Sequence, residues 1–254
     1  MVVFQLISFL ILGLVFGSFI SAFTWRYSRG ISIVKGRSIC PRCKKQIAWY
    51  DNIPLLSYLV LSGRCRNCKK HISFRYPLIE VVTALGFVAI IYFVSPTQTL
   101  SLQVVFSIVI FLILESIFII DLEERIIPDP LVFLGIAISL AYYFTQEPTL
   151  VINRLFASFV AGVLLLLIHL ITRGRGMGLG DVKFAILGGL IVGPKLFLIW
   201  LLLAFLTGSI VGIILILSRR AKLKSQIAFG PFLIFAIPLT LLYGEKILSW
   251  IYLS

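Results

Sequence analysis

Two aspartates stand at the ends of apolar segments, where a buried carboxylate is costly. Asp121 ends the apolar run of FIIDLEERIIPD, and Asp181 follows the glycines of GRGMGLGDVKF. Ionisable residues at membrane depth are expensive and mark functional sites by default. Two carboxylates that face each other within reach of water are the minimum for aspartyl peptide hydrolysis, because an ionised one activates water while a protonated one polarises the scissile carbonyl. The pair predicts this chemistry if the fold brings both ends together.

The expected helix ends indicate which aspartate holds the proton. Asp181 opens a helix, where the backbone dipole favours an anion, whereas Asp121 lies near a helix C-terminus, where it does not. We therefore expect Asp181 as the resting base and Asp121 as the resting acid, with coupled titration of the two. Gly178 and Gly180 support this loop, since a backbone without side chains admits an extended substrate. A structural interpretation, with Asp181 as a helix cap, stays open.

Four cysteines form a second group of possible ligands. They occur as CPRC and CRNC, with 21 residues between the two pairs: Cys40, Cys43, Cys65 and Cys68. Two such pairs close a four-sulfur zinc site of the structural type, which leaves no position for water. Disulfides are the alternative, but they rarely persist in a reducing compartment. His71 lies close behind and is either a replacement ligand or a solvated side chain.

The elements that position these groups follow from composition. The chain has 254 residues, of which 60% are hydrophobic and 13% charged, with a mean hydropathy of +1.08. This composition excludes a soluble domain and predicts an all-α polytopic membrane protein. A span needs about 20 apolar residues, and we expect about eight transmembrane helices, two of them short, at 4–25, 77–95, 100–120, 131–145, 153–172, 181–194, 196–218 and 228–252.

Charge predicts the orientation of these helices. If the connections alternate between the two sides, 20 of the 23 lysines and arginines fall on one side, 12 of them between Arg26 and Arg75. Basic residues are retained in the cytoplasm, so we expect both termini outside and a cytoplasmic loop that binds zinc. The first span lacks a basic n-region and reads as an uncleaved helix. Contact with anionic membrane lipids accounts for the net charge of +13, without a nucleic-acid partner.

Three further ionisable residues lie within the expected spans. Glu80 is in the first turn of its helix, where a structural role is at least as plausible as a functional one. Glu115 precedes Asp121 by six residues, and His169 lies three before the end of its span. Each of the last two can be a hydrogen-bonding group between helices or part of the chemistry.

Nearly the whole chain resembles one family. GLGD resembles the Gly-x-Gly-Asp motif of intramembrane aspartyl proteases, and its surroundings resemble the bacterial type IV prepilin peptidases. The other motifs of the family follow in the expected order: GSF at 17–19, CPRC, CRNC, WYDNIPLLSYL and RYPLIE. In this family the first catalytic aspartate stands shortly before an Ile/Leu-Pro-Asp motif, and here Asp121 stands before IIPD. The resemblance makes Asp181 the second catalytic aspartate, and we expect Asp129 to cap the next helix. Ser21 departs from the family, which usually has asparagine there.

The resemblance implies an enzyme of the bacterial inner membrane. Members remove the short basic leader of type IV prepilins and of the pseudopilins of type II secretion, on the cytoplasmic side. Those with this cysteine loop commonly then methylate the new N-terminal residue with S-adenosylmethionine. The chain shows no fingerprint for that donor, so the methyltransferase rests on the resemblance alone. We expect a first helix at 1–25, a zinc loop with the methyltransferase region at 26–76, and a peptidase domain at 77–254.

Other classes of function fit less well. A proton-coupled transporter also holds carboxylates at broken helices, but it is expected to show matched halves, and the sequence has no internal repeat. A zinc metalloprotease requires a His-Glu-x-x-His helix, which is missing from the sequence. A peptidase without methyltransferase activity remains an alternative.

Overall fold

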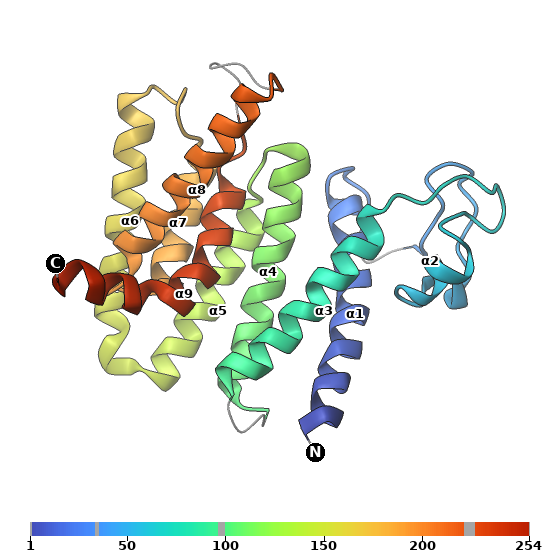
Figure 1. Ribbon diagram of the computed structural model, residues 1–254, viewed down its shortest axis with the longest axis horizontal. Helices are drawn as coiled ribbons and strands as arrows, with labels where there is room; N and C mark the ends of the chain where they lie inside the picture. The colour runs from blue at the N-terminus through green and yellow to red at the C-terminus, as the bar shows by residue number, and fades with distance from the viewer. Residues whose placement is uncertain (1, 34–35, 96–99, 221–226, 254) are drawn as a thin grey trace. The chain divides into compact units, whose positions relative to one another are not determined.

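The computed structural model describes residues 2–33, 36–95, 100–220 and 227–253, and these are almost entirely helical (Figure 1). Each expected apolar segment coincides with one long helix. The helices are α1 (Val2–Tyr27), α3 (Arg75–Val94), α4 (Leu102–Glu124), α5 (Asp129–Gln146), α6 (Val151–Ile171), α7 (Leu179–Val192), α8 (Phe197–Leu217) and α9 (Gly230–Leu253). Short helices η1 (Trp49–Asn52), α2 (Leu56–Val60) and η2 (Pro148–Leu150) complete the described elements. Lys35, Lys222 and Lys224, which the charge argument includes, lie outside the described residues.

Six of these helices are long and apolar enough to cross a membrane, which confirms a multi-pass architecture. They are α1, α3, α4, α6, α8 and α9, the α6 span including the preceding η2. The expected count of eight is not confirmed, because α5 and α7 do not meet the same criteria of length and composition. With 14 residues, α7 is roughly 21 Å long, which is shorter than a hydrocarbon core of about 30 Å.

The chain divides into two compact units, Met1–Leu112 and Ile113–Ser254. In the first unit, α1 packs along α3, and glycines allow the close approach. A Cβ atom at Gly13 would stand 2.5 Å from the Cα atom of Ala84, and one at Gly17 would stand 2.7 Å from the Cα atom of Glu80. Small residues of this kind let apolar helices pack backbone to backbone. The expected domain boundary at 76/77 stays a prediction.

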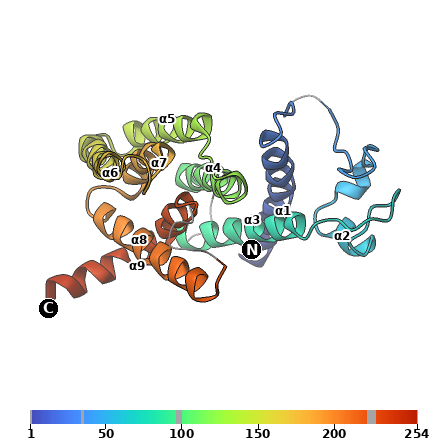
Figure 2. The same cartoon turned by 90° about the horizontal axis from the view of Figure 1, so that it is seen from above.

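The second unit is built around α7. This helix contacts α5, α6, α8 and α9 (Figure 2), and ten of its residues are buried. A Cβ atom at Gly189 would lie 2.8 Å from the Cα atom of Ser158 on α6. Protein therefore surrounds α7 on most sides, which explains how a short helix with no polar face is stabilised in this unit.

Candidate active site and metal centre

Asp121 lies near the C-terminal end of α4 and is only 4% exposed. Its Oδ2 atom is buried and has no hydrogen-bond partner among the described residues. Gly230, the first residue of α9, lies directly against this carboxyl group. A Cβ atom at Gly230 would overlap Oδ2, so only glycine lets the start of α9 approach this acid.

Asp181 lies in the first turn of α7 and is 8% exposed. The helix begins at Leu179, two residues before the expected start. The carboxylate therefore reaches back over the turn, and the N–H of Gly178 donates to Oδ2 at 3.1 Å. This is one half of a capping box. Gly178, and not Asp181, is therefore the N-cap of α7. Asp181 supports the helix start from the third position, and its second carboxylate oxygen is not needed for this bond.

The side chain of Ile127 connects the surroundings of the two aspartates. A Cβ atom at Gly180 would lie 3.1 Å from Ile127 Cβ, and one at Gly230 would lie 3.0 Å from Ile127 Cδ1. The two carboxyl groups are close enough for the charge of Asp121 to act on Asp181. The second unit therefore brings together the two acids that the sequence singles out, with glycines on both sides.

Two residues that hold the glycine loop were not recognised from the sequence as its support. His169, at the end of α6, makes a hydrogen bond of 2.8 Å through Nδ1 with the carbonyl oxygen of Met177. The N–H of Gly176 donates to Thr172 Oγ1 at 3.2 Å. Because a carbonyl oxygen only accepts, His169 Nδ1 carries the proton. Glu115 is buried in α4.

The expectation that Asp129 caps a helix is wrong. Asp129 is the first residue of α5, Pro128 occupies the capping position, and no side chain caps this end. The Asp129 carboxylate instead accepts a hydrogen bond of 2.6 Å from Lys183 Nζ, which lies two residues after Asp181. This ion pair ties the start of α5 to the start of α7.

The two cysteine pairs fold into equivalent turns. In the first, the Cys40 N–H donates to the Lys45 carbonyl oxygen and the Lys44 N–H donates to the Cys40 carbonyl oxygen, both at 2.9 Å. The second turn repeats both bonds at the same distances between Cys65 and the residues at 69 and 70. Lys44 and Lys69 both have a positive φ, 60° and 56°. The local sequence therefore forms the same turn twice, around each pair of thiols.

The four thiols form one cluster that can hold a metal ion. Their sulfur atoms all lie within 4.8 Å of one another, and none is in a disulfide. Tetrahedral zinc with Zn–S bonds of about 2.3 Å separates sulfurs by about 3.8 Å, so the cluster fits such an ion after slight contraction. Backbone hydrogen bonds, the strongest from Cys68, lower the pKa of the Cys65 thiol to about 7. His71 is exposed and not in the cluster; its backbone pairs with Arg64.

Polar contacts join the loop to α3, and α3 to α1, in the first unit. Glu80 Oε2 accepts a hydrogen bond of 2.8 Å from the N–H of Leu55, and the Ser18 side chain also bonds to this carboxyl group. Arg75 donates to the Ser21 carbonyl oxygen at 3.0 Å and to Thr24 Oγ1 at 2.7 Å. The motif RYPLIE thus holds the segment WYDNIPLLSYL through Glu80 and joins α3 to α1 through Arg75, roles that its spacing alone did not reveal.

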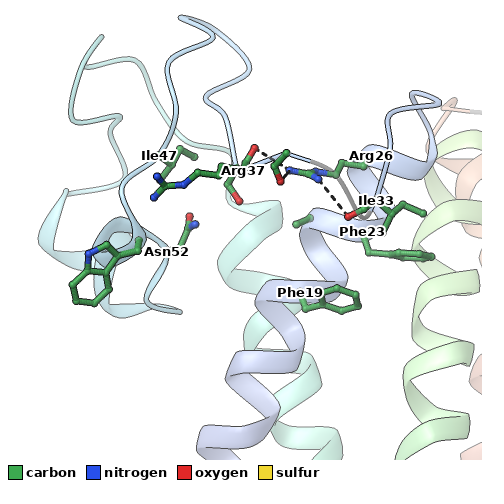
Figure 3. Close-up of a pocket in the computed structure, with 11 residues that line it drawn as sticks. Phe19, Phe23, Arg26, Ile33, Arg37, Ile47 and Asn52 are labelled. Atoms are coloured by element: carbon green, nitrogen blue, oxygen red, sulfur yellow. Dashed lines mark hydrogen bonds between the residues drawn. The ribbon is translucent and has the colours of Figure 1, made fainter.

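A cavity of about 300 Å³ lies between the loop and the end of α1 (Figure 3). Its wall combines rings, a guanidinium group and an amide, from Phe19, Phe23, Trp49, Arg37 and Asn52 among others. Arg26 fixes the surrounding backbone through hydrogen bonds to four carbonyl oxygens, including those of Gly36 and Arg37. The cavity is therefore lined by both apolar and cationic groups.

Two family models match the two parts of the chain. Residues 11–94 match the bacterial peptidase A24 N-terminal domain, and residues 106–213 match the type IV leader peptidase family. The chain belongs to the type IV leader peptidase family. The leader peptidase match contains both Asp121 and Asp181, whereas the N-terminal match contains the four cysteines, Glu80 and the cavity residues.

Several relatives within this family are named prepilin leader peptidase/N-methyltransferase. The chain is 38% identical to that of Aeromonas salmonicida strain A449 over 86% of its own length and 75% of the relative. For the Pseudomonas aeruginosa relative the identity is 33%, over 85% and 74% of the two lengths. For the Vibrio cholerae relative it is 35%, over 79% and 84%. No solved structure matches the chain.

Proposed function

We propose that this leader peptidase is an intramembrane aspartyl endopeptidase that removes the basic leader of type IV prepilins and type II secretion pseudopilins. Cleavage takes place on the cytoplasmic side of the inner membrane. The same enzyme then methylates the new N-terminal amine. Family membership and the names of the relatives support both activities, and the orientation rests on the charge asymmetry of the connections.

The observation that carries the peptidase is the pair of buried acids with unequal surroundings. Asp181 accepts an N–H bond at a helix N-terminus, which favours its ionised form. In this role it takes a proton from water while the water oxygen attacks the scissile carbonyl carbon. Asp121 Oδ2 has no partner among the described residues, so its proton is available for the carbonyl oxygen. Collapse of the tetrahedral intermediate breaks the C–N bond, and a proton passes to the leaving amine.

The test is leader cleavage of a co-expressed pilin. Asp121→Asn and Asp181→Asn should each lower the rate by at least about 10²-fold, because loss of an acid or base typically costs 10²–10⁴. The amide of Asp181→Asn keeps a side-chain oxygen for the Gly178 N–H, so membrane abundance should not change. Asp181→Ala removes this hydrogen bond as well and should also lower thermal stability. Glu115→Gln is the control and should retain substantial activity. Near-normal cleavage by Asp181→Asn would exclude the aspartyl mechanism.

Zinc is the metal that we assign to the cysteine cluster. Four thiolates in a tetrahedral set favour zinc and leave no open position, so the ion would stabilise the loop and take no part in catalysis. The basic residues around the cysteines offset the double negative charge of such a centre. The loop has little apolar core of its own, which makes its folding depend on the metal.

The methyl donor has its best candidate site in the cavity beside α1. S-adenosylmethionine supplies an electrophilic methyl group there. The rings of Phe19 and Phe23 offer apolar faces to an adenine, and the guanidinium of Arg37 suits the carboxylate of the donor. An amine is nucleophilic only after cleavage, since the lone pair of a peptide nitrogen is delocalised. Proteolysis therefore has to precede methylation.

A further inference from the structure

The zinc loop has an apolar middle segment between its two basic turns. In residues 49–60, six large apolar side chains are exposed: Trp49, Tyr50, Ile53, Leu56, Leu59 and Val60. Leu59 and Val60 are 71% and 69% exposed. These six residues, which we call the apolar patch, lie on η1, α2 and their junction. Large exposed apolar side chains gathered on one short segment mark an interaction surface.

The position of this segment along the helices indicates what it contacts. Glu80 lies five residues after Arg75, so its Cα atom is roughly 7.5 Å along the axis from the start of α3. The bond from the Leu55 N–H to the Glu80 carboxylate therefore places the segment beside the second turn of a membrane-spanning helix. Figure 1 shows α2 level with the first turns of α3, and Figure 3 shows Asn52 near the level of Phe23 on α1.

The charge of the loop complements a particular membrane surface. Between Arg26 and Arg75 the sequence has 12 basic residues and one acidic residue, Asp51. Asp51 is paired with Arg66 through hydrogen bonds of 2.7 to 3.2 Å. The side chains of Arg42, Lys44, Lys45, Arg64 and Lys69 are exposed on the zinc turns. Basic groups around an apolar patch favour a leaflet that contains anionic lipid.

We propose that the apolar patch is inserted into the headgroup and upper acyl region of the leaflet that α1 and α3 enter, with the basic zinc turns on its anionic headgroups. The loop is then an interfacial element of the membrane protein, although its sequence lies outside the spans. On the same segment, the backbone N–H of Leu55 is bonded to Glu80 and the Tyr58 ring lies against Gly63, so protein holds this part of the segment. This inference does not depend on either proposed chemistry.

The test uses tryptophan reporters in the full chain, reconstituted in vesicles with acyl chains brominated close to the headgroup. Leu59→Trp places the reporter on the apolar patch, and Lys45→Trp is the matched control on the first zinc turn. Zinc content and leader cleavage show that each variant is folded. The fluorescence of the added reporter is obtained by subtraction of the parent protein. We expect bromine to quench the Leu59→Trp reporter several-fold more than the Lys45→Trp reporter, and aqueous acrylamide to show the opposite preference.

Two further arms separate lipid from other occupants. Vesicles of phosphatidylcholine mixed with phosphatidylglycerol should give stronger bromine quenching of Leu59→Trp than phosphatidylcholine alone; equal quenching would remove the electrostatic part of the proposal. Access of acrylamide to Leu59→Trp equal to that of Lys45→Trp would overturn the proposal. Protection that arises only when a pilin transmembrane peptide is added would also overturn it, because the patch would then be a substrate surface.

Discussion

The cysteine cluster and the aspartate pair are assembled in opposite ways. In the cluster, each pair of ligands lies within four residues, and the same short turn forms twice with the same backbone bonds. The aspartates are separated by 60 positions, and helix packing alone brings them into electrostatic range. The ligand turns of the first site are thus determined largely by local backbone geometry, whereas the second site depends on glycines that let helices approach. A substitution in the cysteine cluster and a substitution at the aspartate pair should therefore affect different parts of the protein.

Loss of one cysteine should give the largest of the expected effects, because it should remove the metal and unfold the loop. Cys40→Ser or Cys65→Ser should reduce zinc from about one ion per chain to near zero, since a structural site needs all four ligands. The loop should then unfold, and trypsin sensitivity between Arg26 and Arg75 should rise in step with zinc loss. Metal analysis and limited proteolysis of purified protein measure both.

Peptide cleavage by these cysteine variants should fall indirectly, and less than in the aspartate variants. His71→Ala serves as the control and should keep its zinc, since His71 lies outside the cluster. A protein that lacks zinc, with its thiols paired as disulfides in fresh membranes, would contradict the metal site and the cytoplasmic orientation together.

A single methyl group at Gly230 tests whether the acid pair depends on close helix approach. Gly230→Ala should disturb the Asp121 carboxylate, because the new Cβ atom would overlap Oδ2. Overpacking of this kind costs about 1–3 kcal/mol, which corresponds to roughly 5- to 160-fold in rate if it acts on the transition state. The measurement is the cleavage rate at equal membrane abundance.

Gly212→Ala is the matched control for Gly230→Ala. A Cβ atom at Gly212 meets only Ile227 Cδ1, at 3.9 Å, so this variant should cleave at close to the normal rate. Equal activity of the two variants would mean that the start of α9 does not shape the site.

The smallest expected effect is the response of methyl transfer to loss of Asp181, the proposed catalytic base. Asp181→Asn should methylate a pre-cut pilin peptide with a free amine at the wild-type rate, because the donor site is proposed in the other unit. Arg37→Ala should weaken binding of labelled S-adenosylmethionine while leaving cleavage unchanged. We would measure the first outcome as transfer of labelled methyl to the synthetic peptide in detergent. The second would be measured as equilibrium binding of the labelled donor.

Failure of the methyl-transfer experiment has two distinct forms. Absence of transfer by a wild-type enzyme that cleaves full-length substrate would leave a peptidase only. Methyl transfer with unchanged donor affinity in Arg37→Ala would instead place the donor outside the cavity beside α1.

The sequence by itself determined the helices and the identity of the groups that could do chemistry. Long apolar runs need helical hydrogen bonding in a membrane, and each predicted segment is a helix. The motifs around Asp121, Asp181 and the cysteines indicated the family, because each motif is a short run of neighbouring residues that can be recognised in the sequence. Metal ligation within a short turn can be read from the chain, since few residues separate the ligands.

Only the tertiary structure decided which groups meet. It decided that Asp129 pairs with Lys183 and does not cap α5, that His169 holds the glycine loop, and that Glu80 binds the backbone of Leu55. Each of these contacts joins residues whose partners depend on helix rotation and depth, which hydropathy does not specify. The surroundings of α7 likewise explain why it can be short. Protein covers most of its sides, so α7 does not need the length of a helix that faces lipid.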